Sequence, residues 1–171
     1  MKTFRELLNG GDLRSIGKSN EVITLITDQE SFDNLFSFLF SNKRIVVMRA
    51  ADAIEKVTVK NKEYLLPHKE ELLQLLKITQ NKELKWHLAL LVSRITLNKN
   101  ELSKVWDTLT NWALDNNQSR IVRVNAIQSL YELSCRSPKL KPAFEQTMIT
   151  LQEQNIPSIT TRIKKIRKHW N

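Results

Sequence analysis

The chain has 171 residues, of which 41% are hydrophobic and 26% are charged, so it is long enough to bury a core and does not have a disordered composition. Its formal net charge is +9, and the excess is greatest from Arg136 to Asn171, where eight Lys and Arg stand against two Glu. No stretch approaches the ~18 uninterrupted apolar residues of a membrane span, and the N-terminus lacks the apolar run of a signal peptide, so we expect a soluble, cytoplasmic protein without a membrane partner.

The first 29 residues are expected to form an N-terminal helical lid. All three glycines, Gly10, Gly11 and Gly17, fall in this part of the chain. They separate one helical segment, KTFRELLN, from a second, SNEVITLIT, for which Ser19 or Asn20 is the predicted N-cap. The lid would therefore be two short helices joined by a glycine turn.

Four helical hairpins are predicted to follow, because the remaining chain has long glycine-free segments with apolar residues three and four apart. The first helices lie near 30–41, 68–80, 100–115 and 140–154. The second helices align on Ala50, Ala89, Ala126 and Ile163, which are separated by 39, 37 and 37 residues. A nearly constant period of this length is typical of stacked helical hairpins.

The predicted fold is therefore all-α, a right-handed α-solenoid of about four hairpins in a single domain over residues 1–171. The lid would occupy 1–29 and the hairpins 30–171. A hairpin cannot cover its own apolar stripe and stacks on its neighbour to do so. The small side chains of Ala50, Ala89 and Ala126 would let adjacent helices approach closely.

One second helix carries a family resemblance. The segment RIVRVNAIQSLYELS at 120–134 resembles the second helix of a HEAT repeat, and IVVMRAADAIEKV and ELKWHLALLVSRI are similar in register, although neither has Arg at the position of Arg123. Through RSIGKSNEV, MRAADAIEKVT and KWHLALLVSRI, the whole chain is also similar to a group of bacterial HEAT-type proteins with no assigned activity. The resemblance implies a scaffold that binds proteins and, in some cases, nucleic acid.

Polar residues on the second helices are the candidate partner-binding surface, because these helices generally line the inner face of such arrays. Each helix contributes a polar stripe, and we predict a groove of mixed charge. The alternative is that these side chains only form weak pairs on exposed helix faces. The candidate residues are Arg49, Asp52, Lys56, Glu83, His87, Arg94, Asn125 and Gln128, with Glu132 on the same stripe as the last two.

The C-terminal segment SITTRIKKIRKHWN has two interpretations. Its apolar residues Ile159, Ile163, Ile166 and Trp170 recur at helical spacing and should dock on the preceding hairpin. The cations then form either the polar cap of a terminal repeat, which we favour, or an anion or nucleic-acid patch. The candidate patch is Arg162, Lys164, Lys165, Arg167 and Lys168.

No arrangement of residues predicts catalysis. Cys135 is the only cysteine, and the three histidines lack zinc-site spacing, so we expect no catalytic residue, metal or cofactor. Trp106 and Asp107, with Arg94 and Arg123, raise a minor hypothesis, because HEAT-like DNA glycosylases hold a damaged base among such residues. The main prediction is a protein-binding scaffold that is not an enzyme; the alternative is a nucleic-acid binder, including the repair type.

Overall fold

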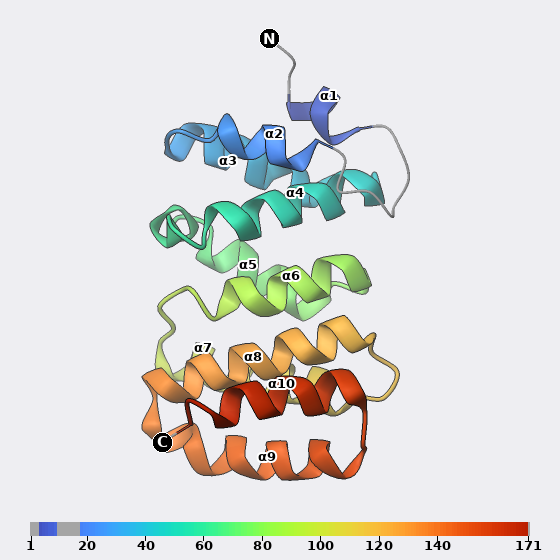
Figure 1. Cartoon of the computed structure of the whole chain (residues 1–171). Helices are drawn as coiled ribbons and strands as arrows, with labels where there is room; N and C mark the ends of the chain where they lie inside the picture. The colour runs from blue at the N-terminus through green and yellow to red at the C-terminus, as the bar shows by residue number, and fades with distance from the viewer. Residues whose placement is uncertain (1–3, 10–17, 171) are drawn as a thin grey trace. The chain divides into compact units, whose positions relative to one another are not determined.

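The computed structural model describes residues 4–9 and 18–170, and these residues form helices and no strand (Figure 1). The chain divides into two compact units, an N-terminal unit up to Glu71 and a C-terminal unit from Leu72 onward. The all-helical prediction is confirmed. The single-domain organisation stays a prediction.

The helices alternate as the sequence period predicts. The first helices are α3 (Gln29–Ser37), α5 (Lys69–Ile78), α7 (Lys99–Leu114) and α9 (Lys141–Glu153). The second helices are α4 (Arg44–Val57), α6 (Lys82–Val92), α8 (Arg120–Arg136) and α10 (Pro157–Arg167). Short 3-10 helices lie at η1 (Phe38–Phe40), η2 (Lys62–Leu65) and η3 (Pro138–Leu140). All four aligned residues are fully buried: Ala50, Ala89, Ala126 and Ile163.

Capping side chains explain where several helices begin. At the start of α7, the Asn98 side chain accepts from the Glu101 backbone N–H, and the Glu101 carboxylate accepts from the Asn98 N–H, which is a complete capping box. The Ser119 hydroxyl accepts from the Val122 N–H at the start of α8. Pro157 is the first residue of α10, where its missing N–H removes no helical hydrogen bond.

Two short helices precede the hairpins, α1 (Phe4–Leu8) and α2 (Ser19–Thr24), and both contact α4. The predicted N-cap of the second of these helices is wrong. Ser19 is already helical and fully buried, and its hydroxyl donates to Asp52 Oδ2 at 2.7 Å instead of capping the helix. The predicted glycine turn lies outside the described residues.

In the N-terminal unit, His68 joins α3 to the start of α5. Its ring stacks on Phe36 with 3.9 Å between ring centroids. Its Nε2 lies 2.7 Å from Asp33 Oδ1, and its Nδ1 lies 2.7 Å from Glu71 Oε2. Hydrogen bonds from Gln29 and then His68 hold the pKa of Asp33 below its ordinary value.

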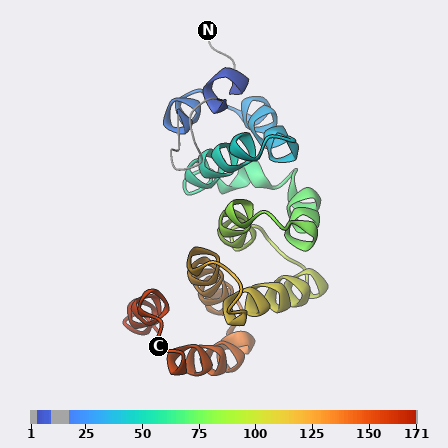
Figure 2. The ribbon, with the colours of Figure 1, turned by 90° about the vertical axis from the view of Figure 1, so that its right-hand side faces the viewer.

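In the C-terminal unit, α6, α8 and α10 follow one another on one side, and α7 and α9 lie on the other (Figure 2). The core between them is fully buried and contains Leu88, Ile127, Leu130, Phe144 and Met148. Because α6 and α8 touch directly, the side chains at their contact, such as Ala89 and Ala126, must be small.

We predict that Ala126→Leu destabilises the protein by about 1–3 kcal/mol, because the added methylenes must enter a close-packed contact. Ile121→Leu on the same helix is the control. Ile121 is 50% exposed, so its replacement should change the free energy of unfolding by less than about 0.5 kcal/mol. Urea denaturation of both variants measures the difference, and equal midpoints would contradict close approach at Ala126.

We predict a pH-dependent contribution to stability from Asp33. Because its pKa is lowered in the fold, the ionised carboxylate stabilises the native state above the ordinary pKa, and this contribution is lost as the pH falls through the lowered value. Asp33→Asn should therefore be less stable than the parent at pH 6 and should approach the stability of the parent as the pH falls through the lowered pKa of Asp33. Denaturation curves across that range test the sign, and a difference that grows on acidification would refute it.

Candidate functional site

Direct hydrogen bonds join the second helices of the C-terminal unit. Ser129 Oγ donates to the Ala89 carbonyl at 2.5 Å, and Asn125 Nδ2 donates to the Trp86 carbonyl at 2.9 Å. The partners are 40 and 39 residues apart, close to the repeat period. The bonds therefore fix the register of α8 against α6, with equivalent positions side by side.

A chain of polar side chains crosses all three of these helices. Arg162 on α10 donates to Gln128 Oε1 at 2.8 Å. Gln128 Nε2 donates to Glu132 Oε1 at 3.0 Å, and the other Glu132 oxygen accepts from the Oγ of Ser93, the C-cap residue of α6, at 2.6 Å. Arg136, at the end of α8, donates to the Ser93 and Ile95 carbonyls. These contacts hold the side chains in fixed positions between neighbouring helices.

Apolar groups are exposed beside these hydrogen-bonded side chains. Ile121 precedes Asn125 by one helical turn and is 50% exposed, although it lies on a polar face. The indole of Trp86 is half-buried. We define the second-helix surface as the set Trp86, Ile121, Asn125, Gln128, Glu132 and Arg162. Aromatic and apolar groups among fixed hydrogen-bonding groups are typical of a protein-binding surface.

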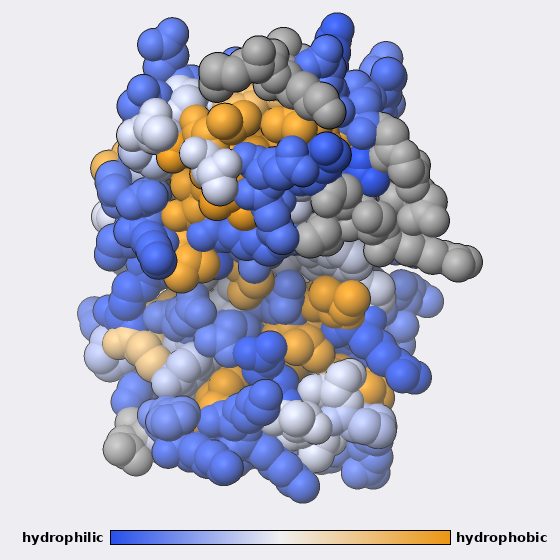
Figure 3. Space-filling view, turned by 45° about the horizontal axis from the view of Figure 1, so that its top comes forward, coloured by the Kyte–Doolittle hydropathy of each residue, from blue (hydrophilic) through white to orange (hydrophobic). Residues whose placement is uncertain are grey.

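Ile121 was missed by the sequence analysis, which considered only polar residues on the second helices. An apolar residue on the polar face of α8 was a signal that could have identified it. The other exposed large apolar side chains among the described residues are Phe40, Val59, Leu66, Ile78 and Ile149. The face shown in Figure 3 is mostly hydrophilic, with an extended apolar area in the upper part of the view and smaller ones below it.

Three predicted site residues lie on α4 and are engaged by the N-terminal helices. Arg49 is 1% exposed and donates to the Leu8 carbonyl at 3.0 Å. Asp52 accepts from Ser19 and from Lys56, whose ammonium lies 2.8 Å away and also donates to Asn20 at 3.1 Å. A partner-binding role for these residues stays a prediction.

The predicted stripe on α6 is largely covered. Glu83 and His87 are each 6% exposed. Arg94 is half-buried and lies two residues past the end of α6, so it does not share a helix face with them as predicted. By contrast, Asn125 and Gln128 are half-buried and belong to the hydrogen-bonded arrangement described above. The structure therefore brings these last two together with Arg162 and leaves Glu83 and His87 inside the fold.

The C-terminal helix docks as predicted. Ile159, Ile163 and Ile166 are buried. Trp170 is half-buried, with its ring centroid 5.2 Å from Phe144 and 5.9 Å from Tyr131. Burial raises the pKa of Tyr131, with a further contribution from its hydrogen bond to Cys135.

The five residues of the candidate basic patch differ in exposure and in their partners. Arg162 is half-buried against Gln128, and Arg167 pairs with Glu145 at 2.7 Å. The other three residues are exposed lysines: Lys164, Lys165 and Lys168.

Arg123 is a structural clamp. It is 2% exposed and donates to the Ala113 carbonyl at 2.8 Å, to Asn116 Oδ1 at 2.9 Å and to Gln154 Oε1. Burial lowers the pKa of the Arg123 guanidinium. These bonds fasten the end of α7 and the end of α9 to α8.

Two residues of the glycosylase hypothesis are largely buried, since Trp106 is 8% exposed and Arg123 is 2% exposed. The Arg123 guanidinium bonds to Ala113, Asn116 and Gln154, and a role in holding a base stays a prediction. Among the described residues, no group of three or more His, Cys, Asp or Glu could hold a metal ion. None of the helices in the same ranges is long and apolar enough to cross a membrane.

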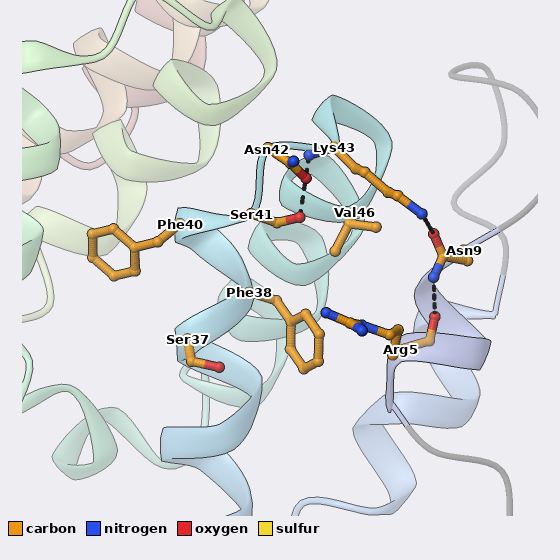
Figure 4. Close-up of a pocket in the computed structure, with 9 residues that line it drawn as sticks. All are labelled: Arg5, Asn9, Ser37, Phe38, Phe40, Ser41, Asn42, Lys43 and Val46. Carbon is orange, nitrogen blue, oxygen red and sulfur yellow. Dashed lines mark hydrogen bonds between the residues drawn. The ribbon is translucent and has the colours of Figure 1, made fainter.

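A pocket of about 370 Å³ lies in the N-terminal unit between α1, η1 and the start of α4 (Figure 4). Arg5 and Lys43 bring two cations to it, and its other lining residues are neutral. Lys43 Nζ donates to Asn9 Oδ1 at 3.4 Å, and Phe38 lies beside the Arg5 side chain. This chemistry favours a small anion over a cation.

The repeated hairpins, buried small residues and register-fixing hydrogen bonds define an α-solenoid. The chain belongs to the HEAT repeat domain family, whose model matches residues 6–170. HEAT repeats generally serve as protein-interaction scaffolds and are typically not catalytic. No curated protein and no solved structure shows significant similarity to the chain.

We predict that Arg123→Ala lowers the free energy of unfolding by about 3 kcal/mol, because hydrogen bonds to a buried charge are lost and their acceptors stay behind. Arg123→Lys should lower the free energy of unfolding by a smaller amount, because one ammonium group cannot reach all three acceptors. Arg120→Ala, at an exposed position on the same helix, is the control and should cost less than about 0.5 kcal/mol. Chemical denaturation checks the order, and equal stability of the Arg120 and Arg123 variants would exclude the clamp.

Proposed function

We propose that the protein is a non-catalytic scaffold that binds another protein through the second-helix surface of the C-terminal unit. The proposal rests chiefly on one observation, the side-chain hydrogen bonds that join α6, α8 and α10 into a single arrangement. Contacts held in place before binding reduce the entropy lost on association. Membership of the HEAT repeat family supports the same function.

The composition of the surface supports a protein partner. Trp86 and Ile121 supply apolar area, and truncating such anchors usually costs most of the binding energy at an interface. Asn125, Gln128 and Glu132 offer polar groups at their edge. The proposal does not use Arg49, Glu83 or His87, because these side chains are buried. We also propose a cytoplasmic location, which is consistent with a single free cysteine, Cys135.

We predict that a photo-cross-linking residue at position 121 or 128 traps the partner in host cells. The same residue at position 103 or 146 is the matched control, because Ser103 and Gln146 are exposed on the first helices α7 and α9. Adducts should form at the second-helix positions, and Ile121→Asp should reduce the yield at position 128 about tenfold. Adduct yields at positions 103 and 146 equal to those at positions 121 and 128 would contradict the proposed surface.

A further inference from the structure

Helix α10 is attached to its neighbours along both edges. On one edge Arg162 donates to Gln128 of α8. On the other, Arg167 donates to Glu145 and Gln152 of α9, at 2.7 and 3.3 Å. The isoleucine stripe between these edges is buried. Both arginines therefore contribute to the fold.

The lysines of α10 have no such role. Lys164, Lys165 and the C-cap residue Lys168 are exposed and lie away from the isoleucine stripe. Within residues 4–9 and 18–170, none of them has an ion-pair or hydrogen-bond partner. We call these three residues the lysine face. Lys165 lies on the same helix as Arg162, which belongs to the second-helix surface.

The net charge of the protein is concentrated in the same unit. Residues 1–71 contain 11 Lys and Arg and 11 Asp and Glu, whereas residues 72–171 contain 16 and seven. The whole excess of +9 therefore belongs to the C-terminal unit. A terminal helix needs polarity and gains from cations in its last turn, but neither requirement excludes acidic residues from the rest of its outer face. Charge complementarity points to an anionic partner.

The surroundings favour an acidic protein segment over nucleic acid. Proteins hold single-stranded nucleic acids with a positively charged groove together with aromatic rings on which the bases stack. Trp170, the Trp, Tyr or Phe residue nearest to these lysines in sequence, packs on Phe144 and Tyr131, and the Lys141 ammonium lies 5.3 Å from its centroid. The neighbouring second-helix surface offers Ile121 and Trp86, which suit a chain that carries apolar side chains as well as carboxylates.

We propose that Lys164, Lys165 and Lys168 dock an acidic segment of the partner protein, with carboxylates clustered within about two helical turns. This inference rests on the proposed function and assigns the chemistry of the partner. Exposed lysines screened by salt contribute mainly to the association rate and to specificity, so binding should weaken as ionic strength rises.

The test uses the full chain and a fluorescent amphipathic peptide of about 14 residues. In this peptide, Leu residues three and four apart form one face of a helix, and Glu residues form the opposite face. The test variant is K164Q/K165Q/K168Q. The control is K77Q/K99Q/K104Q, which removes the same charge from exposed positions elsewhere in the C-terminal unit. We expect the test variant to bind the peptide about tenfold more weakly and the control less than about twofold, at about 150 mM salt.

Three results would overturn the inference. The first is no binding of the peptide to the parent protein, and the second is an equal loss of peptide affinity in the test and control variants. The third is an oligothymidylate of about 14 nucleotides that binds through the same lysines more tightly than the peptide, which would assign the lysine face to nucleic acid. Thermal denaturation confirms that both variants fold. The cross-linking experiment distinguishes the two proposals: adducts at position 121 with no loss in the lysine variant would leave the scaffold proposal standing and remove this one.

Discussion

Close contact between successive second helices is the constraint on which the C-terminal unit depends. Ala89 and Ala126 are fully buried, and Ser129 places its hydroxyl on the Ala89 carbonyl. That carbonyl already belongs to α6, so the bond connects one helix backbone directly to the next helix. A larger side chain at this contact would separate the helices and break both the packing and the bond.

This contact also determines how the polar groups are arranged. Once α8 is held in register with α6, Asn125 meets Trp86 and Glu132 meets Ser93. The arrangement continues to α10 through Gln128 and Arg162. Side chains that would otherwise be mobile on separate helices become parts of one surface, which is why the proposed interface lies on the second helices.

The sequence predicted the fold well, because the repeat places small or apolar residues at intervals of 37 to 39 and each buried one marks a helix contact. The site was harder to predict. Arg49 and Asn125 look alike on a helical pattern, yet one is enclosed by α1 and the other lies partly exposed beside α6. Burial of a polar side chain depends on the neighbouring element, and the pattern of one helix contains no information about that neighbour. The prediction of Ser19 as an N-cap was wrong for the same reason, because its hydroxyl donates to Asp52 on the neighbouring helix α4.

The Arg123 clamp has a consequence for how the unit unfolds. In a repeat array, stability is the sum of each repeat and its interface with the next, and end repeats can melt separately. Arg123 belongs to α8 but bonds to the ends of α7 and α9, so the last two hairpins share one guanidinium. Detaching the final hairpin removes a partner from a buried charge in the hairpin before it. The two hairpins are therefore coupled thermodynamically and should open together as one cooperative segment.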